Sequence, residues 1–177
     1  MMINLKKTGS SIVVLLLLLL TGCYSSNRKN VTIEMSNRFW DDTVYVDVAC
    51  IKDDMYSQYD MCSKEKYWGT DSDLRLNLHG ESFVFDIYHP TKQRLLKNNP
   101  LWSDLGNDDY LVVLVNMPKS YARVPWKMII PLGSNYLDDD DIFIYISDKG
   151  LIRFDQELDY PNPSLISDED MRRFIKE

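Results

Sequence analysis

The sequence predicts a mainly β protein, an antiparallel β-sandwich with short helical insertions between its strands. Three observations favour this fold class. About seven short segments after residue 30 alternate between apolar and polar residues, or are apolar throughout, as strands do. Turn-forming residues separate these segments. Two stretches without this pattern interrupt them, and the longer one is rich in aromatic and charged residues. Short strands with turn signals between them are typical of a sandwich of two antiparallel sheets.

The chain begins with a short apolar run, residues 12–20, that follows Lys6 and Lys7. The run is roughly half as long as the ~20 residues that a helix needs to cross a bilayer. A positive start, a short apolar stretch and small residues at its exit are typical of a secretory signal. The exit reads LTGC, in which Cys23 follows small residues and provides a thiol that can be acylated. We predict that residues 1–22 are a signal peptide and that Cys23 is lipidated.

The LTGC exit resembles the lipobox of bacterial lipoproteins, whose cysteine becomes the lipidated first residue of the mature chain. The resemblance implies several acyl chains on Cys23, palmitate among them, and stable anchoring needs more than one chain. In such lipoproteins an aspartate after the cysteine often signals retention in the inner membrane, but here Tyr24 follows. The expectation is an outer-membrane lipoprotein facing the periplasm, with residues 23–30 as lipidated cysteine and polar tether. The alternative is an ordinary signal peptide that happens to meet a cysteine.

The segments after the tether carry the strand signal. In residues 43–51, Val44, Val46, Val48 and Cys50 fall on one face of a half-buried strand. Residues 110–117 are almost wholly apolar, which favours a central strand. The letters DKG at 148–150 are a tight-turn signal between the last two strands. The other predicted strands are 31–35, 82–88, 126–132, 142–147 and 151–154.

Two stretches between the strands predict helical insertions. Residues 53–78 lack alternation and contain Ser63 before the letters KEK, an arrangement that favours the start of a short helix. Residues 98–106 place Pro100 in a first helical turn and end on a glycine, which is a stop signal.

The strand pattern ends after residue 154, where Pro161 and Pro163 interrupt the chain. Ser167 is a good helix start, because acids follow it directly and bases lie near the end. The sequence therefore divides into a β-sandwich domain, residues 31–154, and a tail, residues 155–177, with a short C-terminal helix.

Two cysteines remain for the folded domain if Cys23 carries lipid. Cys50 and Cys62 are an even pair in an oxidising compartment, where disulfides form and persist. We predict a disulfide between them, and its short loop would stabilise the fold by roughly 2–3 kcal/mol. The alternative is a pair of unbonded thiols, one buried and one exposed.

The chain is acidic, with a formal net charge of −7 over 177 residues. An acidic surface argues against binding to nucleic acid or anionic lipid, but it allows a basic protein partner. His79 and His89 lack the spacing of a metal-binding pair, and no nucleophile motif or glycine-rich phosphate loop is present. We therefore predict no enzymatic activity, cofactor, metal or small-molecule substrate. The acids at 138–141 are interpreted as a solvated loop rather than a calcium site.

The aromatic residues indicate a protein-binding loop. The letters NRFWDD lie between the first two predicted strands, and Arg and Trp are frequent interface hot spots. The candidate partner-binding residues are Asn37, Arg38, Phe39, Trp40, Asp41 and Asp42. The alternative is that Phe39 and Trp40 fold back onto the sandwich, as we expect of Trp102 and Trp126.

These features together resemble the lipoprotein of the type VI secretion membrane complex, the TssJ type. VDVACIKDD at 46–54 is similar to that family's second strand and following turn, and YWGTDSDLR at 67–75 to the insertion after it. NPLWSDLGNDDYLVVLVNMP at 99–118 resembles its helix, central strand and exit. WKMIIPLG and DDIFIYISDKGL resemble its last strands. The similarity covers residues 31–151 as a pattern of apolar positions and turns, without an invariant motif.

The resemblance implies a transthyretin-like sandwich that is not an enzyme. Such a protein is an outer-membrane anchor that binds the periplasmic domain of a large inner-membrane partner, the TssM type. A loop between early strands takes part in that contact, and residues 37–42 are its nearest equivalent here. The alternative function is a periplasmic immunity or inhibitor lipoprotein that neutralises a basic wall-degrading enzyme. A third, a ligand-binding sandwich, has no visible pocket signature.

Overall fold

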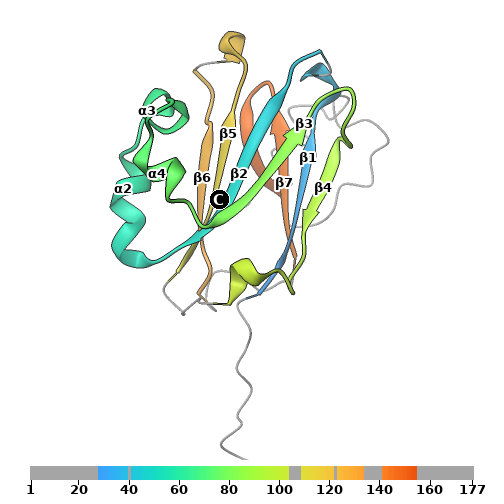
Figure 1. Ribbon diagram of the computed structural model, residues 1–177. Coiled ribbons are helices and arrows are strands. Elements are labelled where there is room, and N and C mark those ends of the chain that lie inside the picture. Colours follow the sequence, from blue (N-terminus) through green and yellow to red (C-terminus); the bar gives the residue numbers. More distant parts are fainter. Residues whose placement is uncertain (1–27, 40, 104–108, 122, 134–140, 155–177) are drawn as a thin grey trace, which may run out of the picture.

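The computed structural model describes residues 28–39, 41–103, 109–121, 123–133 and 141–154 (Figure 1). These residues form a sandwich of two four-stranded sheets, which confirms the predicted mainly β sandwich. Sheet A has the strand order β4 (Lys92–Leu95), β1 (Asn30–Met35), β7 (Asp141–Ser147), β8 (Gly150–Phe154). Sheet B has the order β3 (Gly80–Phe85), β2 (Val44–Ile51), β5 (Tyr110–Asn116), β6 (Lys127–Pro131).

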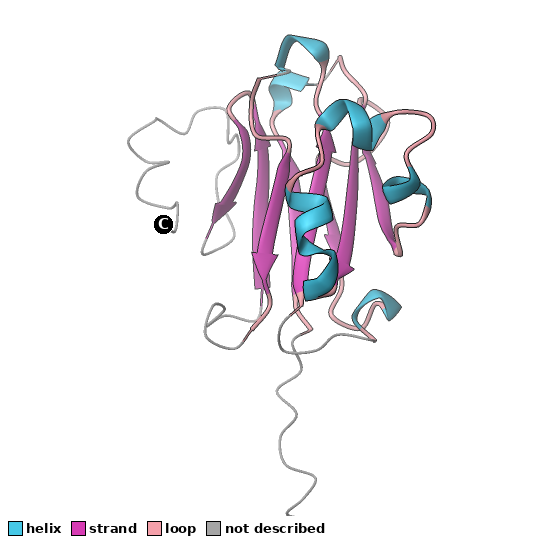
Figure 2. Ribbon diagram, turned by 90° about the vertical axis from the view of Figure 1, so that its left-hand side faces the viewer, coloured by secondary structure: helices cyan, strands magenta, loops and turns pink. Residues whose placement is uncertain are grey.

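The helices of the described residues are short and lie in the connections between strands. They are η1 (Asn37–Phe39), η2 (Asp53–Met55), α2 (Tyr56–Asp60), α3 (Lys64–Trp68), α4 (Asp73–Leu76), η3 (Pro100–Trp102) and η4 (Lys119–Tyr121). Figure 2 shows α2, α3 and α4 lying against one side of the sandwich, which is the outer face of sheet B. None of the described helices is long and apolar enough to cross a membrane.

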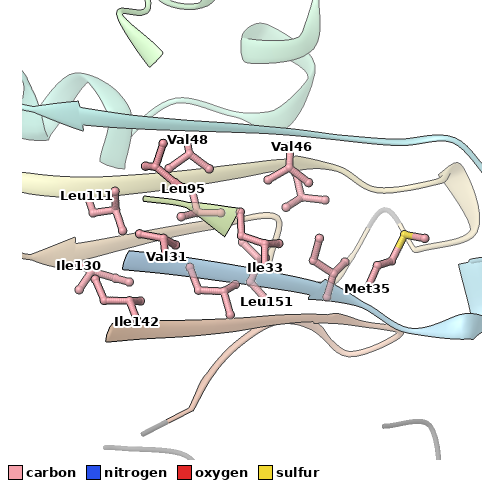
Figure 3. Close-up of a cluster of buried hydrophobic side chains, with 14 of the residues drawn as sticks. Val31, Ile33, Met35, Val46, Val48, Leu95, Leu111, Ile130, Ile142 and Leu151 are labelled. Atoms are coloured by element: carbon pink, nitrogen blue, oxygen red, sulfur yellow. The ribbon is translucent and has the colours of Figure 1, made fainter. Parts of the chain in front are cut away.

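Alternation along the strands places one face of each sheet in a shared core (Figure 3). Val31, Ile33 and Met35 from β1 and Val46 and Val48 from β2 enter it, each at most 1% exposed. Full burial of one such side chain contributes about 1.5–3 kcal/mol. The inward face predicted for residues 43–51 is therefore confirmed.

β5 is apolar throughout because both of its faces are covered. Leu111, Val113 and Val115 belong to the core between the sheets. Val112 and Leu114 belong to a second cluster, in which side chains of the helical insertion pack on the outer face of sheet B. Since β5 lies between β2 and β6, the predicted central strand is confirmed.

The pairing of β1 with β7 departs from a purely antiparallel sandwich. The two strands run parallel, from Asn30 opposite Asp141 to Met35 opposite Ile146, so sheet A is mixed. Alternation along a sequence reports which face a side chain takes, and it carries no information about the direction of the neighbouring strand.

β4 is a strand that the sequence did not predict. It consists of four residues at the edge of sheet A, and only Leu95 among them is buried in the core. Lys92 pairs with Glu34 of β1 at 3.2 Å, and Arg94 Nε donates to Thr32 Oγ1 at 3.1 Å. Charged residues are typical of edge strands, which they protect against further pairing, and they hide the apolar alternation.

Both predicted insertions are helical. Ser63 is the N-cap of α3, because its Oγ accepts a hydrogen bond from the backbone N–H of Lys66 at 3.2 Å. In η3, Pro100 occupies the first turn and Trp102 is 2% exposed, as predicted for the core. Trp126 is half-buried and packs against the second cluster.

The first insertion, residues 53–78, is held on sheet B by two lysine side chains that donate to backbone carbonyl oxygens. Lys127 of β6 donates from Nζ to the carbonyl oxygens of Tyr59 at 3.0 Å, of Asp60 and of Cys62 at 3.3 Å. These carbonyls lie at the C-terminal end of α2 and just beyond it, where a cation is favourable. Lys64 of α3 donates to the carbonyl of Met117 at 2.6 Å.

The turn predicted at 148–150 closes the β7–β8 hairpin, in which Ser147 pairs with Gly150. Gly150 has a φ of +105°, a conformation that other residues rarely adopt. A Cβ atom there would lie 2.6 Å from the carbonyl oxygen of Pro125. Both the backbone angle and the close approach therefore require glycine.

The predicted disulfide is wrong, because Cys50 and Cys62 are both free. Cys50 packs against the core between the sheets, whereas Cys62 belongs to the cluster on the outer face of sheet B. The two thiols therefore lie on opposite sides of the same sheet. Burial, with a smaller contribution from Asp109, raises the pKa of the Cys50 thiol to about 12.

Several predictions fall outside the described residues. These are the signal peptide and Cys23, Trp40 of the candidate loop, the stop at Gly106, most of the acidic run at 138–141 and the tail at 155–177. Asp141, the last acid of that run, is the first residue of β7.

Candidate functional site

Different connections between strands lie at the two ends of the sandwich. β1 begins at one end, where the Asn30 side chain donates to Asp141 Oδ1 at 2.7 Å and accepts from the backbone N–H of Lys97 at 3.0 Å. At the opposite end β1 leads into η1, β5 into η4, and β3 into the turn at residues 86–91 (Figure 1). We call this second end the distal end, formed by η1, η4 and the 86–91 turn.

η1 and the residues that follow it contain the candidate partner-binding residues, which differ in how far they are buried. Phe39 is fully buried and packs edge-on against Tyr121 of η4, with ring centroids 4.9 Å apart. Phe39 is therefore a core residue, which is the alternative that the sequence left open for it, and a partner-binding role for the rest of this loop stays a prediction. The reason is that Phe39 joins the core between the sheets, and Tyr121 of η4 packs against that core next to it. Asn37 and Asp41 are exposed and Asp42 is half-buried.

The 86–91 turn lies beside η1, since the backbone N–H of Met35 donates to the carbonyl of Thr91 at 2.8 Å. Asp86 Oδ1 accepts from the backbone N–H groups of Tyr88 at 2.8 Å and His89 at 3.0 Å, and it lies 2.7 Å from His89 Nδ1. The hydrogen bond from the His89 ring, with the two backbone donors, holds the pKa of Asp86 below its usual range.

This turn presents two apolar side chains to solvent. Tyr88 is 86% exposed and Ile87 is 47% exposed. An aromatic ring on a turn with fixed backbone loses little conformational entropy on binding, which suits it to anchor a partner. Sequence reasoning placed both residues in a strand, 82–88, that ends at Phe85 in the structure. The signal that could have found the turn is an aspartate whose side chain caps N–H groups two and three residues on.

A second polar cluster lies on the outer face of sheet B, around Asp47 of β2. Asp47 is 1% exposed and accepts three hydrogen bonds, from Tyr67 Oη at 3.0 Å, Arg75 Nε at 2.9 Å and Ser82 Oγ at 2.6 Å. Burial, and then the Asp47 carboxylate, raise the pKa of Tyr67, so its hydroxyl remains a donor. The cluster joins the insertion to β2 and β3, which is a structural role.

Neither histidine belongs to a catalytic arrangement within the described residues. His79 is exposed at the start of β3, and His89 contacts the carboxylate of its own turn. No group of three or more histidine, cysteine, aspartate or glutamate side chains in the described part of the chain is placed to hold a metal ion.

Solved structures of related shape include two components of the type VI secretion system. No family model matches the chain, and no curated protein matches it. The C-terminal domain (869-1107) of the T6SS protein TssM from EAEC is 14% identical, with a TM-score of 0.47 over 71% of this chain and 98% of that one. Serratia marcescens Lip, a membrane-bound component of the type VI secretion system, is 12% identical, with a TM-score of 0.49 over 74% and 97%. At these scores neither likeness carries an argument about function.

Proposed function

We propose that this chain is a TssJ-type lipoprotein, a structural component of the type VI secretion membrane complex. In this proposal Cys23 anchors it in the outer membrane, and the sandwich binds the periplasmic domain of a TssM-type inner-membrane partner. The observation that carries the proposal is the opposition of the two ends of β1. The tether joins the strand at Asn30, whereas the loop singled out by the family resemblance lies at the distal end.

The tether sets how far the sandwich stands from the membrane. Residues 23–30 span on the order of 25 Å when fully extended. Because β1 starts where the tether ends, the distal end is the part of the sandwich farthest along this strand from the lipid. A partner that approaches from the inner membrane would meet the distal end first.

The distal end supplies a surface suited to protein binding. Tyr88 and Ile87 offer apolar area on the 86–91 turn, and Asn37 and Asp41 are exposed polar residues at the same end of the sandwich. A central aromatic anchor with polar groups around it is the usual composition of an interface hot spot. We propose that Tyr88 and Ile87 supply the apolar contact previously expected of Phe39.

A non-enzymatic role fits the chemistry of the described residues. The buried carboxylate of Asp47 accepts three hydrogen bonds from Tyr67, Arg75 and Ser82, which fits a structural role in joining the insertion to sheet B. His89 Nδ1 contacts Asp86 and no hydroxyl or thiol nucleophile among the described residues.

The test is the affinity of the distal end for the partner's periplasmic domain. A soluble chain with Cys23→Ser would be titrated with that domain, alone and with Tyr88→Ala or Ile87→Ala. We expect Tyr88→Ala to weaken binding roughly thirtyfold, the effect of losing about 2 kcal/mol. Leu96→Ala is the matched control, because Leu96 is 52% exposed and follows β4 at the opposite end.

Two outcomes would contradict the proposal. Equal affinities for Tyr88→Ala and Leu96→Ala would remove the distal end from the interface. Capture of a wall-degrading enzyme, rather than a TssM-type protein, from detergent-solubilised envelope would favour the inhibitor function.

A further inference from the structure

The outer face of sheet A carries an apolar stripe along the two strands at one edge. It consists of Phe143 and Tyr145 from β7 and Ile152 and Phe154 from β8. The strand register places Phe143 opposite Phe154 and Tyr145 opposite Ile152. Ile144, between Phe143 and Tyr145, and Leu151, just before Ile152, belong to the core between the sheets, so the stripe faces away from sheet B.

The stripe is buried although it lies on an outer face. Tyr145 is 3% exposed, Ile152 8% and Phe154 2%. Their cluster contains only the four side chains of the stripe among the described residues. The helices α2, α3 and α4 lie on the other side of the sandwich and cannot cover it (Figures 1 and 2).

The other half of the same face does not need a cover. There β1 and β4 present polar pairs, Glu34 with Lys92 at 3.2 Å and Thr32 with Arg94 at 3.1 Å. Such pairs are stable in water, which is usual for the outer face of an antiparallel sandwich. The division of sheet A into a polar half and a buried apolar half therefore indicates a specific cover over β7 and β8.

Sheet B also has an apolar outer face, and there a segment of the same chain covers it. Its outer face carries Ile51, Val112 and Leu114, and the insertion covers them with Tyr59 and Tyr67. The covering segment there follows directly after β2, a strand of the sheet that it covers.

We propose that the tail, residues 155–177, packs over the stripe of sheet A and is its cover in the same molecule. β8 ends at Phe154, which is itself part of the stripe, so the tail starts at the surface it would cover. Its apolar residues include Leu165, Ile166, Met171, Phe174 and Ile175. The last three have the i, i+3, i+4 spacing of one face of a helix. The cover gives the tail a role in closing sheet A, and it reserves the distal end for partners.

Photo-crosslinking in the full mature chain tests the proposal directly. Benzoylphenylalanine would replace Phe174 in a soluble chain with Cys23→Ser, and crosslinked peptides would be identified by mass spectrometry. We expect crosslinks within one molecule to peptides from residues 141–154. The same probe at Tyr88, which lies at the distal end and is 86% exposed, is the control and should give none of these products.

A pair of variants in the full chain provides an independent measurement. Phe174→Asp combined with Ile175→Asp should uncover the stripe, so binding of an apolar dye should rise several-fold. Glu169→Ala and Asp170→Ala change the same segment without removing apolar area and should leave dye binding unchanged. Crosslinks from position 174 only between two molecules would overturn the proposal in favour of a second copy as the cover. Crosslinks to residues outside 141–154 within one molecule would overturn it as well.

Discussion

Arg75 lies across the buried carboxylate of Asp47, with its Nε 2.9 Å from Asp47 Oδ2 and its guanidinium 4.4 Å from the centre of the Trp68 ring. One arginine thus neutralises a charge inside the protein and stacks on an aromatic ring of α3. Because Asp47 belongs to β2 and Arg75 to α4, the pair fixes the insertion to the sheet. The insertion is therefore an integral layer of the sandwich rather than a loose loop.

Removal of this arginine should destabilise the protein more than removal of another one. Arg75→Ala leaves a 1% exposed carboxylate with two neutral donors. Loss of a hydrogen bond to a charged group costs about 1.5–3 kcal/mol. Arg94→Ala, which removes a hydrogen bond to Thr32 Oγ1 at the edge of sheet A, should lower the free energy of unfolding by less, about 0.5–1.5 kcal/mol. Urea unfolding of both variants gives the comparison, and equal midpoints would show that the Asp47 pair contributes nothing.

Truncation of Phe39 should act on stability. Phe39→Ala opens a cavity beside Tyr121 and should cost about 3–5 kcal/mol, the usual effect for a buried phenylalanine. Asp41→Ala, on the exposed part of the same loop, should leave the melting temperature unchanged. Thermal melting by circular dichroism distinguishes the two residues. A small change in the melting temperature of Phe39→Ala would contradict the burial of this ring.

Both cysteines should be reduced and slow to react in the folded protein. With a pKa of about 12, the Cys50 thiol is ionised at pH 8 to on the order of one part in ten thousand. In a chain with Cys23→Ser, iodoacetamide should modify Cys50 only after unfolding, as read by intact mass. A chain lighter by two hydrogen atoms that resists alkylation after unfolding would show that the disulfide forms.

The 86–91 turn should loosen in acid. The pKa of Asp86 is lowered in the folded state, so its stabilising contribution is present above the ordinary aspartate value and is lost as pH falls through the lowered one. His89→Ala removes the largest cause and should raise the pKa of Asp86. NMR titration of the carboxyl carbon measures this. Tyr88→Ala is the control, because it keeps the backbone N–H that Asp86 accepts, and an equal shift in both variants would contradict the assignment.

A substitution at Gly150 should be costly despite its position in a turn. Alanine at a φ of +105° is strained, and its Cβ would lie 2.6 Å from the Pro125 carbonyl oxygen. We expect Gly150→Ala to lower the free energy of unfolding by at least about 1–3 kcal/mol. Lys149→Ala, at the exposed neighbouring position, should have a smaller effect. Chemical denaturation compares the two, and a neutral Gly150→Ala would contradict the strain.

The parts of this fold that follow from local pattern could be predicted from the sequence. The inward face of β2, the cap at Ser63 and the turn at Gly150 each depend on a few adjacent residues. The parallel direction of β1 against β7 and the edge strand β4 depend on residues far apart in the chain, which no local pattern reports.

The same distinction between local pattern and distant contacts applies to the cysteines and to the candidate site. Cys50 was placed on the correct face of β2, but its separation from Cys62 depends on which side of sheet B the insertion covers. The burial of Phe39, which the sequence left open, and the exposure of Tyr88, which it did not predict, also depend on neighbouring residues. Phe39 is buried because η4 lies next to η1, and Tyr88 is exposed because Asp86 ends β3. Residue type alone predicts neither the position of η4 next to Phe39 nor the end of β3 before Asp86.

The parallel pairing of β1 with β7 makes the completion of sheet A depend on two segments that lie far apart in the chain. Asn30 and Asp141 are 111 positions apart, so the second strand of sheet A has no partner on that side until most of the chain is available. The antiparallel pairs of sheet B involve strands that lie closer together in the sequence. Pairings between distant segments form slowly, because the loop between them must be closed first. A chain that emerges from its N-terminus could therefore complete sheet B, and pair β1 with β4, while the other edge of β1 is still unpaired, and that edge would need protection until synthesis is finished.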